Sequence, residues 1–126
     1  MREAIHEERP SGLPLSAAVR GPGVLYLSGQ VALDPANGRL IQGDVAAQTE
    51  RTLENIRALL ESTGASMDDV LRVGVFLTSM ESFGAMNAVY ARYFRTPFPA
   101  RTTVAVRELP LGAAVEIEMT VADRRK

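Results

Sequence analysis

Cysteine is absent from the 126-residue sequence, and His6 is its only histidine. The lack of cysteine excludes disulfides, zinc–cysteine sites and thiol nucleophiles. Because the one histidine lies in a polar N-terminal stretch, neither a Ser-His-Asp triad nor a histidine-based metal site is expected. Glycine-rich phosphate loops of the Walker and Rossmann types are also missing. Catalysis would therefore depend on carboxylate, guanidinium, hydroxyl, amide or backbone groups, and the sequence suggests no metal and no cofactor.

Long apolar runs and a dominant charge are missing as well. No segment approaches the roughly 18 apolar residues of a membrane span, and the N-terminus has no apolar core of a signal peptide. The formal net charge is -1, and the basic cluster at residues 124–126 is typical of a solvated chain end. We therefore expect a cytoplasmic protein of one domain, residues 1–126, with a polar arm over residues 1–14 and no nucleic-acid or membrane partner.

Apolar periodicity and turn signals predict the order strands, helix, strand, helix and two strands. Asp44 is suited to cap the first helix, and Gly64 is suited to end it in left-handed backbone. Pro97 and Pro99 exclude any continuation of the second helix. Strands are predicted over 16–20, 24–28, 70–77, 101–107 and 115–122, a hairpin over 31–41, and the second helix over 80–94.

Two helices are enough to cover only one face of such a sheet. Alternation in the last strand separates Val115, Ile117, Met119 and Val121 from Glu116, Glu118, Thr120 and Ala122. In the strand before it, alternation separates Thr102, Val104 and Val106 from Arg101, Thr103, Ala105 and Arg107. We expect the first set of each strand to pack under the helices and the second to face water or another subunit. The open face is therefore where function is expected.

Four places along the chain could carry chemistry, and each also has a purely structural explanation. The planar guanidinium of Arg101 fits a carboxylate, but a surface ion pair would use it equally well. Glu116 is either a catalytic carboxylate or a solvated acid on an exposed strand. Asn87 lies on the apolar stripe of the second helix, where it would bind a ligand or make a local contact. Ser28 and Gly29 end a strand, where a free N–H could bind an anion or the chain could simply turn.

Taken together and in this order, these positions resemble the RidA/YjgF family over nearly the whole chain. The most specific match is Pro-Ala-Arg-Thr-Thr-Val at 99–104 followed by Glu-Ile-Glu-Met at 116–119. Supporting blocks are Leu-Ser-Gly-Gln at 27–30 and Gly-Asp-Val-Ala-Ala-Gln at 43–48. The second helix adds Phe83, Met86, Asn87, Ala88, Val89, Tyr90 and Phe94.

The resemblance implies a chorismate-mutase-like α+β fold: a mixed β-sheet with two helices packed on one face, assembled as a homotrimer with clefts between subunits. It also implies hydrolytic deamination of enamine or imine intermediates, such as 2-aminoacrylate, to 2-oxo acids and ammonia. In the family, the arginine at the position of Arg101 binds the substrate carboxylate. The glutamate at the position of Glu116 orients or activates water, and the backbone at Gly29 and the side chain at Asn87 shape the pocket.

In that fold Arg101 and Glu116 would lie at opposite ends of antiparallel strands. Six residues of strand span roughly 20 Å, which is too far for one small substrate. Ser28 and Gly29 should lie at the end that carries Glu116. A site that uses all four residues would therefore join Arg101 of one subunit to the other three residues of the next.

Two positions depart from the family pattern, and we include both among the predicted substrate-binding residues. Leu15 stands where relatives often have tyrosine, which makes the pocket more apolar, and Thr103 stands where many have cysteine. The first alternative is a non-catalytic trimer that binds small carboxylates or regulates a metabolic partner. The second is a specialised hydrolase or lyase-like member of a catabolic operon. The family has also been linked to ribonuclease activity, for which the net charge of this chain gives no support.

Overall fold

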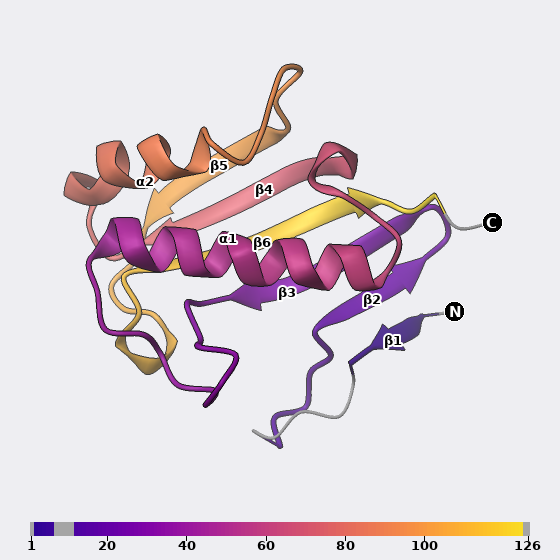
Figure 1. Ribbon diagram of the computed structural model, residues 1–126, viewed down its shortest axis with the longest axis horizontal. Helices are drawn as coiled ribbons and strands as arrows, with labels where there is room; N and C mark the ends of the chain where they lie inside the picture. Colours follow the sequence, from indigo (N-terminus) through magenta and orange to yellow (C-terminus); the bar gives the residue numbers. More distant parts are fainter. Residues whose placement is uncertain (1, 7–11, 125–126) are drawn as a thin grey trace.

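In the computed structural model, which describes residues 2–6 and 12–124, a single β-sheet carries two helices on one face (Figure 1). The strands are β1 (Glu3–Ile5), β2 (Ala18–Gly21), β3 (Val24–Gln30), β4 (Val70–Leu77), β5 (Ala100–Ala105) and β6 (Val115–Ala122), and the helices are α1 (Val45–Ser62) and α2 (Phe83–Tyr90). The strand order is β1-β2-β3-β6-β4-β5, with β4 and β5 parallel and every other pair antiparallel. The predicted mixed sheet with two helices is confirmed.

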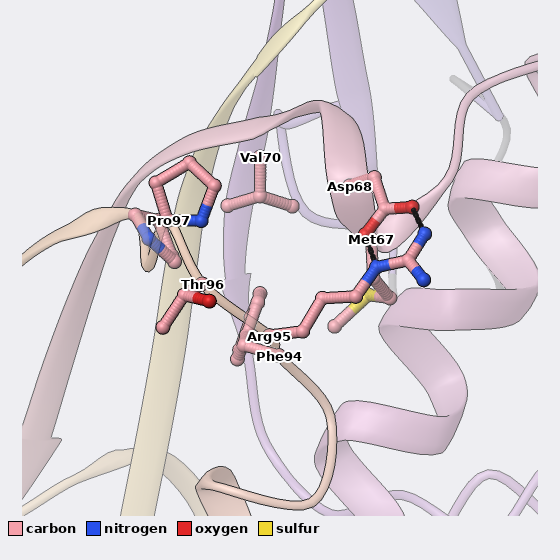
Figure 2. Close-up of a pocket in the computed structure, with 8 residues that line it drawn as sticks. Met67, Asp68, Val70, Phe94, Arg95, Thr96 and Pro97 are labelled. Atoms are coloured by element: carbon pink, nitrogen blue, oxygen red, sulfur yellow. Dashed lines mark hydrogen bonds and ion pairs between the residues drawn. The ribbon is translucent and has the colours of Figure 1, made fainter.

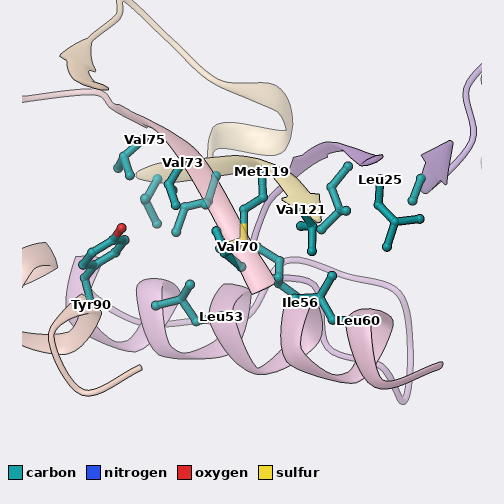
Figure 3. Packing of buried hydrophobic residues seen from close by; sticks show 14 of the residues in the cluster. Leu25, Leu53, Ile56, Leu60, Val70, Val73, Val75, Tyr90, Met119 and Val121 are labelled. Carbon is teal, nitrogen blue, oxygen red and sulfur yellow. The ribbon is translucent and has the colours of Figure 1, made fainter. Parts of the chain in front are cut away.

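Apolar side chains from the sheet and from α1 form the core between the two layers (Figure 3). The cluster includes Val115, Ile117, Met119 and Val121 of β6 with Leu53, Ile56 and Leu60 of α1, all of them buried. This confirms the alternation predicted for the last strand. Since burying one such side chain contributes about 1.5–3 kcal/mol, the apolar set of β6 fixes which face of the sheet the helices cover.

Helix α1 begins and ends as predicted. Asp44 caps it, because its carboxylate accepts a hydrogen bond from the N–H of Ala47 at 2.9 Å. Gly64 follows the last turn with a φ of 85°, a conformation in which a side chain would be strained. Both signals are local in sequence, which is why they could be recognised without the fold.

Helix α2 is shorter than the predicted helix over 80–94. A 3-10 turn occupies Met80–Ser82, and the regular helix stops at Tyr90. Beyond it, the N–H groups of Arg92 and Tyr93 donate to carbonyls three residues earlier. This tighter spacing ends the α-helix while Tyr93 stays packed against the core.

The predicted polar arm over 1–14 includes a strand. Glu3–Ile5 forms β1, which pairs with β2 at one edge of the sheet. On β2, Arg20 is buried, and its guanidinium pairs with the carboxylate of Asp123 at 2.6 Å. Residues 7–11 of the arm, and 125–126 of the basic tail, lie outside the described residues.

The predicted hairpin over 31–41 is present in a minimal form, with backbone hydrogen bonds from Ile41 to Ala32 at 2.9 Å and from Asp34 to Arg39 at 2.8 Å. A single antiparallel bridge joins Leu33 to Leu40, and no strand forms on either side of it. The carboxylate of Asp34 instead accepts from the N–H of Ala36 at 2.8 Å. The chain therefore turns where the Asn-Gly pair predicted, but the antiparallel pairing does not extend beyond one bridge.

The side-chain faces of β5 are opposite to the prediction. In the parallel pairing with β4, Arg101 lies beside Val73 and Thr103 beside Val75, and both valines are fully buried. Arg101 and Thr103 therefore point to the helix face, whereas Val104 is exposed on the open face. The prediction failed because β5 is an edge strand that is partly exposed on both faces, so its apolar alternation does not report the covered side.

Candidate functional site

The first group of predicted residues meets where β3 ends and β6 begins. The pairing of these strands shifts register between Leu27 and Gln30, which forms a bulge at Ser28 and Gly29. The carboxylate of Glu116 lies against this bulge. A Cβ built on Gly29 would stand 2.6 Å from Glu116 Oε2, closer than any real contact. Glycine at position 29 is therefore what allows the carboxylate to approach the backbone.

Glu116 is a carboxylate with an altered proton affinity. Burial raises the pKa of Glu116 above that of an exposed glutamate, and the negative charge of Glu118 raises it further. Within residues 2–6 and 12–124 no cation pairs with it. A carboxyl group whose pKa is shifted towards neutrality is suited to take up and return a proton during catalysis.

Glu116 lies at the wall of a cavity of about 400 Å³. The lining also includes Gly29, which places the bulge and the carboxylate at the same surface. Leu15 lines this cavity and has 41% of its surface exposed, so the predicted departure from the family pattern is part of the same site. Its isobutyl side chain offers no hydrogen bond there.

The hydroxyl proton of Ser28 is used in a hydrogen bond within the chain and is not directed at a ligand. Its hydroxyl donates to the carbonyl of Ser16 at 2.6 Å, and its N–H donates to the carbonyl of Ala17 at 3.0 Å. These bonds fasten the segment that carries Leu15 to the end of β3. The hydroxyl oxygen can still accept a hydrogen bond.

The second group gathers around Arg101 on the helix face. Its guanidinium carbon lies 4.7 Å from the centroid of the Tyr90 ring and 5.6 Å from that of Phe83. Both rings belong to α2, and their faces attract a cation. None of the described carboxylates forms an ion pair with Arg101. The side chain is thus held in place by aromatic rings while its planar fork remains available for an anion.

Asn87 and Thr103 lie on the same elements as the residues of this group, Asn87 on α2 and Thr103 two positions after Arg101 on β5. Asn87 lies between Phe83 and Tyr90 on the same face of α2, since residues four and three apart are neighbours on a helix. The hydroxyl oxygen of Thr103 is buried and has no hydrogen-bond partner. Burial raises the pKa of Tyr90, whereas the charge of Arg101 opposes that rise. A buried polar group without a partner indicates that a further group completes its surroundings.

The two groups stay apart within one chain. Along β4, Arg101 lies beside Val73 and Glu116 beside Phe76, so about 10 Å separates them along the strands and about 10 Å across them. The predicted spacing of 20 Å along the strand was therefore too large. What separates the two side chains most is that Arg101 points to the helix face and Glu116 to the open face. One chain alone does not place them around the same small molecule.

Gln48 is a residue of the site whose role the sequence did not reveal. It is buried on α1, where its amide oxygen accepts from the N–H of Ala114 at 2.9 Å and its NH₂ group donates to the carbonyl of Gly43 at 3.1 Å. Ala114 precedes β6 by one residue. Gln48 thereby fixes the start of the strand that carries Glu116, and its place in the 43–48 block was the signal available.

A separate cavity of about 160 Å³ lies between the loop after α2 and the 3-10 turn at Met67–Asp69 (Figure 2). Arg95 lines it, and its guanidinium makes two contacts with the carboxylate of Asp68, one of them from Nε at 3.1 Å. The hydrogen bond from Arg95 holds the pKa of Asp68 below its usual range. None of the predicted site residues lines this cavity. Its two charged side chains, Arg95 and Asp68, pair with each other.

Metal-ligand clusters and membrane-spanning helices are both missing from the part of the chain that the structure describes. No group of three or more histidine, aspartate or glutamate side chains could hold a metal ion there. Neither of its helices is both long enough and apolar enough to cross a membrane.

Comparison with known proteins gives a consistent family. Residues 6–123 match the family model described as Endoribonuclease L-PSP. A RutC family protein of Pyrococcus horikoshii is 43% identical over 94% of this chain and 95% of its own length. A 2-iminobutanoate/2-iminopropanoate deaminase of the mite Dermatophagoides farinae is 39% identical over 86% of this chain and 84% of its own. The crystal structure of RidA from an Antarctic Psychrobacter bacterium superposes with a TM-score of 0.85 at 36% identity, covering 94% of this chain and 95% of that one.

The names of these relatives refer to two activities, imine deamination and RNA cleavage. The two activities would need different surfaces. Imine hydrolysis needs a carboxylate beside a small cavity and a cation for the substrate carboxylate. RNA cleavage needs a basic surface for the phosphate backbone, and the formal net charge of this chain is -1.

Proposed function

Because the chain belongs to the RidA/YjgF family, which is described by the Endoribonuclease L-PSP model, we propose that it hydrolyses reactive enamines and imines of amino acids to 2-oxo acids and ammonia. The observation that carries this proposal is the Glu116 carboxylate, which lies against the Gly29 backbone beside a cavity and has a raised pKa. No cofactor is needed, because the imine carbon is already an electrophile.

In the proposed mechanism Glu116 acts as a general base and then as a general acid. It takes a proton from water as the water oxygen bonds to the imine carbon, which gives a carbinolamine. It then returns a proton to the nitrogen, the C–N bond breaks and ammonia leaves. The imine nitrogen enters the reaction protonated, and the hydroxyl proton of the carbinolamine passes to solvent as the C=O bond forms. The sum is one imino acid and one water converted to one 2-oxo acid and one ammonia.

In the proposal the substrate carboxylate is held by Arg101 of a neighbouring chain. The aromatic rings of α2 orient this guanidinium, and no described carboxylate occupies it. The open sheet face, with Tyr26 and Val104 exposed on it, would pack against other copies to form a homotrimer. Assembly by this face would bring the helix-side Arg101 of one chain to the Glu116 edge of the next. Asn87 and Thr103 would complete the Arg101 side of the pocket.

A competition assay tests the activity. An amino acid oxidase supplies the imine in situ, semicarbazide traps the imine as semicarbazone, and a deaminase lowers semicarbazone formation. We expect Arg101→Ala to lower kcat/KM by about 100-fold, because it removes a charge-assisted bond to the substrate. Glu116→Gln should lower kcat by roughly 100-fold or more while the fold and assembly are retained.

The same assay separates the proposal from the alternative of a non-catalytic carboxylate binder, which Leu15 favours because it supplies no hydroxyl. A chain that binds 2-oxobutanoate in calorimetry but leaves semicarbazone formation unchanged is a binder. Full activity in the Arg101→Ala variant would contradict the assigned anchor.

A further inference from the structure

Leu111 combines two features that do not stabilise the fold. Its backbone adopts a φ of 61° and a ψ of 15°, within the 3-10 turn at Pro110–Gly112. In this left-handed region a side chain costs roughly 1 kcal/mol or more. The side chain is also 68% exposed, so it gains little from burial. Strained backbone of this kind clusters at ligand-binding and catalytic sites, which makes Leu111 a candidate for contact with a ligand.

Leu111 faces the same cavity as Glu116. The apolar residues that line this cavity are Leu13, Leu15, Val31, Leu33, Pro110 and Leu111. Leu13 is itself 58% exposed. Glu116 is the only ionisable side chain among the described residues of the lining. The reacting carboxylate is thus surrounded by an apolar wall to which three separate segments of the chain contribute.

A volume of about 400 Å³ is more than a three-carbon imino acid would fill. With the carboxylate held by Arg101 and the imine carbon next to Glu116, the substrate side chain would point along the apolar wall. A methyl group would leave most of that wall in contact with water. An acidic side chain would meet the negative charge of Glu116 in a site that offers it no cation.

On the basis of the proposed function, we infer that this cavity takes the side chain of the substrate. The preferred substrates are then imino acids with bulky apolar side chains, such as those formed from leucine, methionine or phenylalanine, rather than 2-iminopropanoate. Leu111 is a specificity-determining residue. For the leucine-derived imine, water adds to C2, the C–N bond breaks, and 4-methyl-2-oxopentanoate and ammonia are released.

The test compares two imines in the semicarbazide assay, one made from L-leucine and one from L-alanine by the same oxidase. Each added methylene in an apolar pocket is worth roughly tenfold or more in kcat/KM. We therefore expect the wild-type protein to prefer the leucine-derived imine by at least about tenfold. Leu111→Asn should lower this preference by about tenfold, mainly through KM for the larger imine.

Asparagine is the informative substitution because it tolerates left-handed backbone, so the turn should persist. Leu111→Gly is a second variant that relieves the backbone strain and should lower the preference in the same way. Leu71, which is 53% exposed and does not line this cavity, gives the matched control: Leu71→Asn should leave the preference unchanged.

The outcomes distinguish the inference from the function on which it rests. Equal turnover of the two imines by the wild-type protein would overturn the inference but leave imine hydrolysis intact. So would an unchanged preference in both Leu111 variants. Turnover of neither imine would end both proposals.

Discussion

At the scale of single residues, the candidate site depends on glycine positions as much as on its polar side chains. Gly29 has no Cβ, and the Glu116 carboxylate occupies the space that a Cβ would need. Gly74 accommodates Glu118 in a similar way, with a distance of 3.0 Å from a hypothetical Cβ to Glu118 Cγ. Of the two carboxylates, only that of Glu116 lines the cavity. The two glycines therefore form a natural pair for comparison.

Gly29→Ala should displace the Glu116 carboxylate, because its new Cβ would otherwise lie 2.6 Å from Oε2. A misplacement of about 1 Å at a reacting group costs roughly 100-fold, so we expect a fall of that order in kcat. The measurement is the steady-state rate of imine hydrolysis, with circular dichroism to check the fold.

Gly74→Ala is the control for Gly29→Ala. It also crowds a glutamate on the open face, but the Glu118 carboxylate lies outside the cavity. We expect a change in stability and less than about tenfold loss in kcat. Equal losses in the two variants would mean that crowding of the sheet, and not the position of Glu116, controls the rate.

At the scale of secondary-structure elements, the position of β6 depends on α1. The helix buries its apolar stripe against β6, and Gln48 adds a polar connection between the first turns of the helix and the residue before the strand. Apolar contacts fix the distance between the two elements but tolerate sliding. A hydrogen bond to the N–H of Ala114 fixes the position of β6 along its own axis, and with it the position of Glu116.

Gln48→Ala should leave the N–H of Ala114 and the carbonyl of Gly43 without their present partners. The cost of an unsatisfied buried group is about 1–3 kcal/mol, so we expect the free energy of unfolding to fall by about 2 kcal/mol. Urea unfolding at one fixed protein concentration measures it, because assembly would otherwise change the apparent stability. Gln48→Glu keeps an acceptor for Ala114 but turns a second acceptor towards the Gly43 carbonyl in a buried place, so it should lose at least as much. An unchanged unfolding midpoint in Gln48→Ala would show that water replaces both bonds.

At the scale of the whole molecule, the proposed site residues form two separate halves. The Glu116 half lies on the open face at one end of β6, and the Arg101 half lies under α2. Figure 1 shows β5, the strand that carries Arg101, at the edge of the sheet. Opposite faces of one sheet cannot converge on one ligand. The two halves become one site only if copies of the chain associate, which is why activity and assembly are linked in our proposal.

Mixed trimers test this link. Arg101→Ala and Glu116→Gln chains, each inactive alone, are co-expressed with different tags and purified for both tags. In a cyclic trimer with both kinds of chain, one of the three interfaces joins an intact Arg101 to an intact Glu116, so about one third of wild-type activity should return. Trimers that carry both substitutions on every chain provide the background. Confirmed mixed trimers without activity above that background would contradict a site shared between chains.

Particular residues show how far the sequence could be interpreted. Asp44, Gly64 and the alternation from Val115 to Val121 act through local backbone geometry and burial, and their roles were predicted correctly. The face of the sheet to which Arg101 points was predicted wrongly. On an edge strand that is partly exposed on both faces, the alternation of polar and apolar residues does not report which face the helices cover. The residues of the 43–48 block were recognised, but the bond from Gln48 to Ala114 spans 66 positions, and no local pattern reports it.

The sequence by itself determined the order of the main strands and of both helices, the covered face of β6, the family and the residue types available for chemistry, because propensity, capping and periodicity act over a few residues. Only the tertiary structure decided that Glu116 lies against Gly29, that Arg101 lies on the rings of α2, and that Leu111 joins the wall of the Glu116 cavity. These contacts depend on strand register and on a bulge, which are set by packing of the whole sheet.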